Sequence, residues 1–160
     1  MCDINATTIS DKLLDRAHYW VKMYPDITYR MGGERVESNG VLDCSAFIWN
    51  VLGLKKKDRN TDWILKDATT KQTFFKQIDT PIPGCIAVYG TAWERIKLPD
   101  GTVKVKRHSG HVGIVSSPSK FTVIDCSSSE GGIREHIQKV LFVGPKYGNR
   151  DVVFCLPIKL

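Results

Sequence analysis

Residues 41–48 of the chain read Val41-Leu42-Asp43-Cys44-Ser45-Ala46-Phe47-Ile48. Aspartate is a common helix-capping residue, and the apolar residues that follow have helical spacing, so the stretch predicts a helix beginning at Cys44. Backbone dipoles at a helix N-terminus favour the thiolate, the nucleophilic form of cysteine. The alternative is a small core thiol, because free cysteines are among the most buried residues. A catalytic cysteine also requires a histidine elsewhere in the chain.

The sequence around this stretch predicts a helical N-terminal half. A helix capped by Thr8 or Ser10 carries apolar residues at helical spacing until Pro25 ends it. The other elements predicted in this half are an extended piece with a glycine turn at 27–33, a polar loop up to residue 40, the Cys44 helix ending before Gly53, and one or two short helices at 61–78.

The second half of the chain has the pattern of an antiparallel sheet. A hairpin is predicted over 93–107, turning at Pro99-Asp100-Gly101. The other predicted strands are 85–89, 111–115, 121–126, 133–137 and 152–156. The fold class is therefore α+β, with N-terminal helices packed on a central antiparallel β-sheet. Because no repeat, linker or composition break divides the chain, we expect one domain over residues 1–160.

Of the four histidines, His111 is the best candidate for a base. His18 lies among polar residues of a helix and His136 in a strand flanked by charge, while His108 would face away from His111 if one strand held both. That parity also argues against a two-histidine metal site. A hairpin over residues 116–120 that pairs Val115 with Phe121 would place His111 opposite Asp125.

Asp125 has two interpretations at this stage. Opposite His111 its carboxylate can hold the imidazole in one tautomer, as an orienting third group does. As a residue at a strand end it can instead cap the serine-rich loop at 127–132, a common role for aspartate. Cys126, the next residue in the strand, points the other way and is expected in the core.

The composition narrows the function classes. A net charge of +6 and a pI near 9.1 favour a polyanionic partner, which includes nucleic acid, anionic lipid and a bacterial envelope. The basic residues are scattered without the aromatic interleaving of a single-strand nucleic-acid platform, so we expect no nucleic-acid partner. The densest basic run, Lys55-Lys56-Lys57-Asp58-Arg59, is interpreted as a solvated helix end.

The sequence also predicts where the protein is made and whether its cysteines are reduced. No apolar run approaches the ~20 residues of a membrane span, so no stable membrane insertion is expected. The first ten residues lack the features of a secretory signal, which predicts synthesis in the cytoplasm without a signal peptide. Cys2, Cys44, Cys85, Cys126 and Cys155 are widely spaced and odd in number, and are interpreted as reduced thiols.

Together these motifs resemble the NlpC-type cell-wall cysteine peptidases of the papain-like superfamily, with the CHAP amidases and peptidases as relatives. The resemblance covers roughly residues 29–137. Asp43-Cys44-Ser45-Ala46-Phe47 resembles the family's Asp-Cys-Ser-Gly-Phe motif, and Gly110-His111-Val112-Gly113-Ile114 its histidine strand. Tyr29-Arg30-Met31-Gly32-Gly33 resembles the preceding Tyr-x-Trp-Gly-Gly segment, and Pro83-Gly84 stands where the family has Pro-Gly-Asp.

The resemblance implies a papain-like fold and a role for each matched residue. Cys44 would be the nucleophile, His111 the general base and acid, and Asp125 the orienting residue. Tyr29 would shape the substrate cleft, with Asp43 and Ser45 lining it, and no metal or organic cofactor would be needed. The departures are Ala46 for glycine, Met31 for tryptophan, Cys85 for aspartate, and an aspartate at the third catalytic position, where the NlpC group often has histidine.

The implied activity is hydrolysis of an amide bond in bacterial peptidoglycan, in the stem peptide beside γ-D-glutamate. The alternatives are an N-acetylmuramoyl-L-alanine amidase of CHAP type, an acyltransferase using the same residues, and a non-catalytic wall-binding module. A small basic protein without a signal would suit a bacteriolytic phage endolysin, released by a holin or carried on a tail, that acts as a monomer on the cell wall. The hairpin at 93–107 looks like an insertion that borders the cleft.

Overall fold

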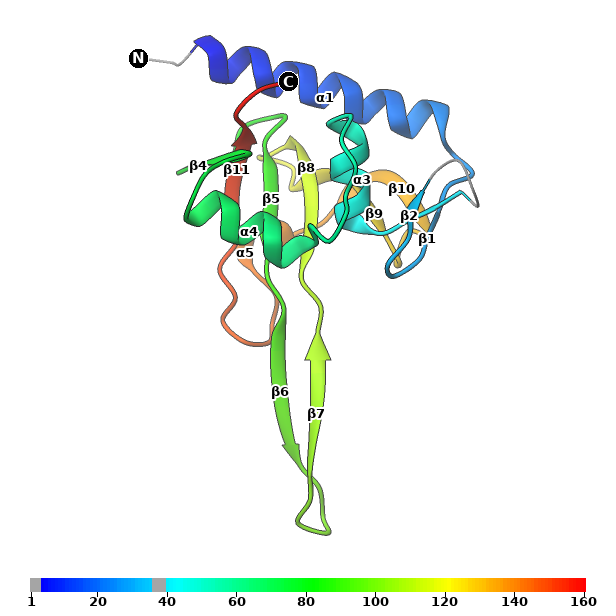
Figure 1. Cartoon of the computed structure of the whole chain (residues 1–160), viewed down its shortest axis with the longest axis vertical. Coiled ribbons are helices and arrows are strands. Elements are labelled where there is room, and N and C mark those ends of the chain that lie inside the picture. The colour runs from blue at the N-terminus through cyan, green and yellow to red at the C-terminus, as the bar shows by residue number, and fades with distance from the viewer. Residues whose placement is uncertain (1–3, 36–39) are drawn as a thin grey trace.

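The computed structural model describes residues 4–35 and 40–160; Cys2 and residues 36–39 of the predicted polar loop lie outside the described residues. A six-stranded sheet organises the fold, in the order β10-β9-β8-β5-β11-β4, and every neighbouring pair is antiparallel (Figure 1). The prediction of mixed α and β structure with a large antiparallel sheet is confirmed. The strands are β4 Phe75–Ile78, β5 Ile86–Tyr89, β8 His111–Ser117, β9 Thr122–Ser127, β10 Gly132–Ile137 and β11 Val153–Pro157.

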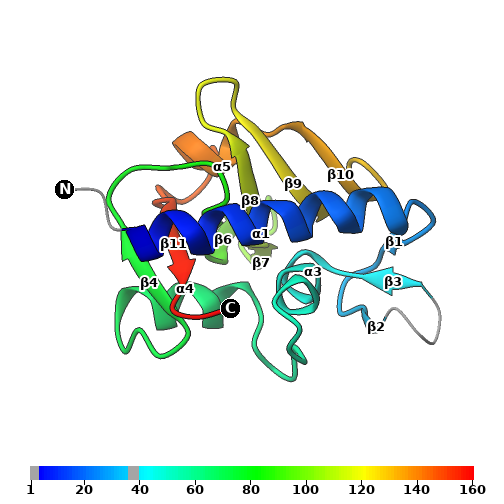
Figure 2. The same cartoon turned by 90° about the horizontal axis from the view of Figure 1, so that it is seen from above.

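Helix α1, Ile4–Met23, runs across one end of this sheet (Figures 1 and 2). It ends just before Pro25, as predicted, but the predicted start is wrong, because Thr8 and Ser10 lie inside the helix. At Ser10 the helix packs closely on the loop before β5. Gly84 there has a φ of +87°, and a Cβ on it would lie 2.0 Å from the Ser10 carbonyl oxygen.

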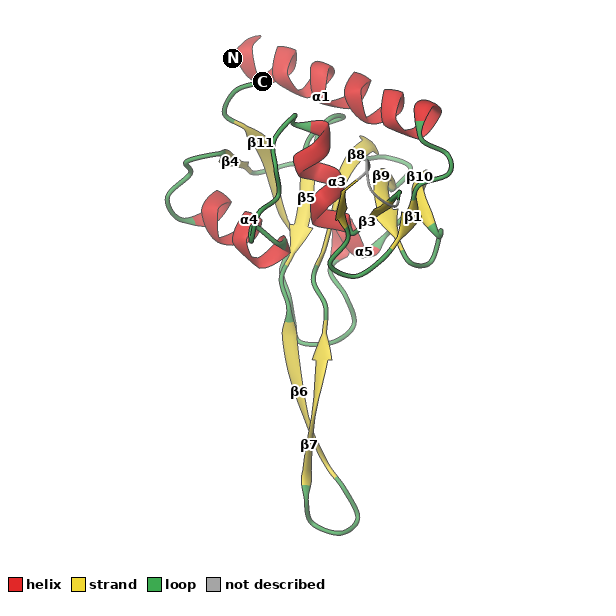
Figure 3. Ribbon diagram, turned by 45° about the vertical axis from the view of Figure 1, so that its right-hand side comes forward, coloured by secondary structure: helices red, strands yellow, loops and turns green. Residues whose placement is uncertain are grey.

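Two apolar clusters cover the two faces of the sheet. Alternate residues of β5 separate cleanly, since Ile86 and Val88 belong to one cluster and Ala87 and Tyr89 to the other. The larger cluster joins the sheet to α1, α3 (Cys44–Val51) and α4 (Thr61–Thr69). The smaller cluster contains Leu141 of α5 (Val140–Val143). The helices thus hold the sheet from both sides, with α3 nearest the centre (Figure 3).

The prediction of one or two short helices at 61–78 is correct for residues 61–69 and wrong for residues 75–78. Helix α4 is capped by the Asn60 side chain, which accepts the Trp63 N–H, but residues 75–78 form strand β4. Asp67 explains the change, because its buried carboxylate accepts the backbone N–H groups of Thr73, Phe74 and Phe75. These bonds turn the chain out of the helix and into the strand that pairs with β11.

The predicted hairpin is confirmed as a two-stranded ribbon, β6 (Ala92–Lys97) and β7 (Val103–His108), that projects from the body of the protein (Figure 1). Its turn is closed by the Gly101 N–H, which donates to the Leu98 carbonyl at 3.0 Å. His108 and His111 lie in different strands, β7 and β8, so the parity argument that separated them does not apply.

A small sheet brings the segment around Tyr29 to the nucleophile motif. Strand β1 (Thr28–Tyr29) pairs in parallel with β3 (Val41–Leu42), and β2 (Glu34–Arg35) pairs with the other edge of β3. Because β3 leads directly into α3, this pairing fixes Tyr29 beside the start of that helix.

The interpretation of residues 55–59 as a solvated helix end is wrong. Lys56 is buried, and its ammonium lies 2.6 Å from Asp43 Oδ2. The Arg59 guanidinium carbon lies 4.0 Å from the Trp49 ring centroid, and Arg59 also donates to the Lys55 and Lys56 carbonyls. Two of the basic groups in this run therefore hold the α3–α4 connection together.

Within residues 4–35 and 40–160, no helix combines the length and the apolar character needed to cross a bilayer.

Candidate active site

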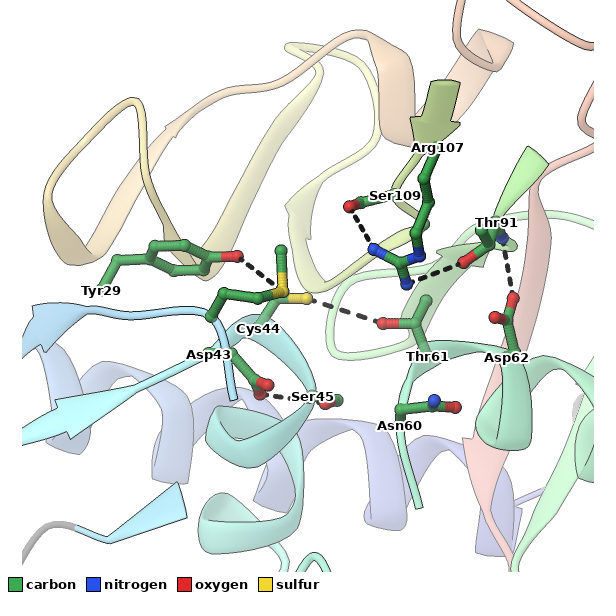
Figure 4. A pocket seen from close by; sticks show the side chains of 12 residues that line it. Tyr29, Asp43, Cys44, Ser45, Asn60, Thr61, Asp62, Thr91, Arg107 and Ser109 are labelled. Atoms are coloured by element: carbon green, nitrogen blue, oxygen red, sulfur yellow. Dashed lines mark hydrogen bonds between the residues drawn. The ribbon is translucent and has the colours of Figure 1, made fainter. Parts of the chain in front are cut away.

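Cys44 is the first residue of helix α3, as predicted. Asp43 caps the helix, since its Oδ1 accepts the Ala46 N–H at 2.8 Å. The first N–H groups of a helix have no intrahelical acceptor, so those of Cys44 and Ser45 lie beside the sulfur as available donors. The Cys44 side chain is 7% exposed, and its sulfur lies 3.6 Å from Thr61 Oγ1 at the start of α4 (Figure 4).

His111 and Asp125 are hydrogen-bonded, with 2.6 Å between Nε2 and Oδ2. The predicted register that placed them directly opposite is nevertheless wrong by two residues. Val115 pairs with Val123 rather than Phe121, because Phe121 has a φ of +56° in the connecting turn and the ladder shifts after Val115. A two-residue shift preserves the face of every side chain, so His111 and Asp125 become diagonal neighbours that still meet.

Glycine at position 113 makes room for this diagonal contact. In the β8–β9 ladder, the position after the Ile114–Ile124 pair sets Gly113 opposite Asp125. A Cβ on Gly113 would lie 3.1 Å from the Asp125 Cβ. A side chain there would compete with the carboxylate for the space between the strands. The glycine therefore lets the Asp125 carboxylate lie fully buried beside the imidazole.

Cys44 lies close enough to His111 to act on the pKa of the imidazole, and Asp125 is hydrogen-bonded to that ring, so the three predicted catalytic residues lie together. The hydrogen bond of the Cys44 sulfur is to Thr61 Oγ1. Because Asp125 occupies Nε2, Nδ1 is the nitrogen left for the sulfur. Burial of the ring lowers the pKa of His111, but the hydrogen bond to Asp125 and the interactions with Cys44 and with the Asp125 charge outweigh it and raise that pKa to about 10. The arrangement therefore favours the imidazolium form of His111.

We expect His111 to stay protonated well above neutral pH. Since the folded-state pKa of about 10 exceeds the ordinary 6.5, protonation of His111 stabilises the fold fully below pH 6.5, and that stabilisation is lost as the pH rises through 10. A histidine NMR titration would measure the midpoint directly. The midpoint should fall in Cys44→Ala, which lacks one of the groups that raise the pKa. A wild-type midpoint at or below 6.5 would contradict the coupling.

His136 is a member of the site that the sequence did not reveal. Its Nε2 lies 2.6 Å from Asp125 Oδ1, so the carboxylate is held between two imidazoles, and its Nδ1 lies 3.4 Å from Glu130 Oε1. Burial raises the pKa of Asp125, but the hydrogen bonds and charges of the two histidines outweigh it and lower that pKa. Strand parity could have found His136, because Arg134 pairs with Asp125 and His136 is the diagonal neighbour.

The three predicted substrate-binding residues all border the space around Cys44. Tyr29 is half-buried; burial, then the charges of Cys44 and Asp43, raise its pKa to about 12, while Arg107 acts in the opposite direction. Asp43 and Ser45 are bound internally, because Asp43 accepts hydrogen bonds from Ser45 Oγ, Gly32 N and Lys56 Nζ as well as from Ala46 N. Their role toward a substrate stays a prediction.

Two hollows lie at the site, and both are lined by Tyr29, Met31, Ser109 and Gly110. The small hollow, about 50 Å³, is bordered by Cys44, Thr61 and Arg107 (Figure 4). The large hollow, about 320 Å³, is bordered by His111 and by the serine-rich loop after β9. Sequence reasoning did not identify Thr61 or Arg107 as site residues, since neither lies in a motif.

The sequence was compared with protein-family models and with curated proteins. No protein-family model matches the sequence, and no curated protein matches it either.

Among the described residues, no group of three histidine, cysteine or acidic side chains is placed to hold a metal ion.

Proposed function

We propose that this protein is a cysteine hydrolase that cleaves an amide bond of bacterial peptidoglycan. The observation that carries the proposal is the hydrogen-bonded pair His111 and Asp125 beside Cys44, which lies at a helix N-terminus and close enough to raise the pKa of His111. A nucleophile, a base in contact with it and a third group that orients the base are the parts that acyl transfer requires. The motif resemblance supplies the papain-like family and the substrate class.

Each group has a defined role in the reaction. His111 takes the proton of the Cys44 thiol before the attack, the sulfur anion then attacks the carbonyl carbon, and the oxyanion is met by N–H groups at the start of α3. His111 then gives that proton to the leaving amine as the C–N bond breaks, which leaves a thioester. Water, deprotonated by His111, attacks the thioester; the C–S bond breaks, and a free carboxylate and the thiol remain.

The bond we assign is in the stem peptide, beside γ-D-glutamate. The amidase alternative would cut the muramoyl-L-alanine bond. The +6 charge of the chain suits an anionic envelope polymer. Action on the bacterial cell wall, as for a phage endolysin, is part of the proposal.

Alkylation at pH 7 tests the activity and the nucleophile together. Iodoacetamide should modify Cys44 and stop the release of fragments from purified peptidoglycan, while Cys85 and Cys155, both fully buried, stay unmodified. Mass spectrometry of the fragments identifies the new carboxyl and amino ends, and therefore the bond. Fragment release that persists after Cys44 is fully alkylated would refute the proposal; equal inertness of all cysteines with no fragments would indicate a wall-binding module.

A further inference from the structure

Arg107 is a cation beside the nucleophile with no ionic partner among the described side chains. It is the second-last residue of β7, where the ribbon joins the body of the protein, and it borders the same small hollow as Cys44 (Figure 4). The other basic groups near the site are occupied. Lys56 is bound to Asp43, and Arg59 lies on Trp49 and donates to backbone carbonyls.

Neutral groups hold the Arg107 guanidinium in place. Its Nη1 donates to Ser109 Oγ at 2.8 Å and its Nη2 to Thr91 Oγ1 at 3.3 Å, and the Trp93 ring centroid lies 6.0 Å from the guanidinium carbon. Two hydroxyls fix the orientation of a guanidinium without neutralising its charge. A guanidinium has five N–H donors, so donors remain for a ligand.

The two acidic side chains of the small hollow, Asp43 and Asp62, both accept hydrogen bonds within the protein. Asp62 Oδ1 accepts the Thr91 N–H at 2.7 Å, and the Asp43 carboxylate is bound to Lys56 and to the start of α3. Arg107 is therefore the cation among the residues that line this hollow, and a planar guanidinium fits a carboxylate better than any other anion-binding side chain does.

The size of the hollow limits what can enter. The small hollow measures about 50 Å³ and the large one about 320 Å³, so the smaller group of a substrate is the one placed beside Arg107. The bulk of a peptide fits the large hollow on the His111 side.

We propose that Arg107 binds a free carboxylate on the residue next to the scissile amide, and so makes the protein select substrates in which this carboxyl group is not amidated. The inference rests on the proposed function, and it names Arg107 as a specificity-determining residue of that same site. Charge-assisted hydrogen bonds of this kind correspond to about a 10- to 100-fold preference.

Two stem peptides test it: L-Ala-γ-D-Glu-L-Lys and the same peptide with the α-carboxyl of the glutamate amidated. We expect kcat/KM to favour the free carboxylate by about 10- to 100-fold in the wild type. Arg107→Gln should bring the ratio close to one by slowing cleavage of the carboxylate peptide, and Arg107→Lys should give an intermediate ratio. Arg95→Gln, an exposed arginine on the same ribbon, removes the same charge and should leave the ratio unchanged.

Binding of both peptides to Cys44→Ala, measured by calorimetry, separates this inference from the proposed function. If Cys44→Ala binds the carboxylate peptide more tightly than the amidated one, and Arg107→Gln abolishes this preference, the carboxylate site is supported. If the wild type also cleaves neither peptide, the hydrolase proposal fails and the carboxylate site still stands. Cleavage of both peptides at equal rates overturns the inference and leaves the hydrolase proposal standing. Equal binding of the two peptides, or a preference that survives Arg107→Gln, also overturns it.

Discussion

Cys44→Ala is expected to abolish release of peptidoglycan fragments, with a fall of ~10⁴-fold or more in kcat, while the protein stays folded. Catalytic residues that act as a unit lose nearly all of their effect when the nucleophile is removed. The Cys44 side chain is small, and the helix is capped by Asp43. Removal of the Cys44 sulfur therefore leaves the start of α3 intact. Turbidity loss of permeabilised cells and mass spectrometry of the fragments measure the activity, and thermal unfolding measures the fold.

Cys85→Ala is the matched control for this prediction. Cys85 is fully buried in the cluster on the other face of the sheet, and burial raises the pKa of its thiol to about 12. The substitution removes the same atom from a comparable core position, so it should lower stability by ~1 kcal/mol and leave turnover within a few-fold of the wild type. Turnover by Cys44→Ala at the level of Cys85→Ala would mean that the sulfur of Cys44 is not the nucleophile.

The sequence predicted those parts of the site that depend on local signals. The Asp-Cys pair before an apolar run places Cys44 at a helix start, because capping and apolar spacing act within one turn of chain. The meeting of His111 and Asp125 was predicted through strand parity, which survives an error of two residues. The register itself was wrong, because it depends on Phe121 adopting a positive φ in the turn.

The parts that the sequence did not predict depend on contacts between distant segments. Strand β4 forms in a stretch of helical pattern because Asp67 binds the backbone at 73–75, and β11 then supplies a partner. Lys56, in a run that resembles a solvated helix end, is buried because Asp43 lies within reach. Such pairings arise from tertiary packing, which local propensity does not encode.

Asp43→Ala is expected to lower the free energy of unfolding by ~3–5 kcal/mol, because it leaves the buried ammonium of Lys56 without a counter-charge. The same substitution removes the acceptor for the Ala46 and Gly32 N–H groups and for the Ser45 hydroxyl. Loss of the cap alone costs ~1 kcal/mol. Urea unfolding followed by circular dichroism measures the change.

A second variant separates this structural role from the substrate-binding role that the motif resemblance implies for Asp43. Asp43→Ala combined with Lys56→Met removes both charges and fills the space with an apolar chain of similar length, and it should recover at least half of the lost stability. The single Lys56→Met leaves a carboxylate that keeps three other donors, so its cost should be smaller than that of Asp43→Ala. If Asp43→Ala instead raises KM without lowering stability, Asp43 acts on the substrate and its bond to Lys56 contributes little to the fold.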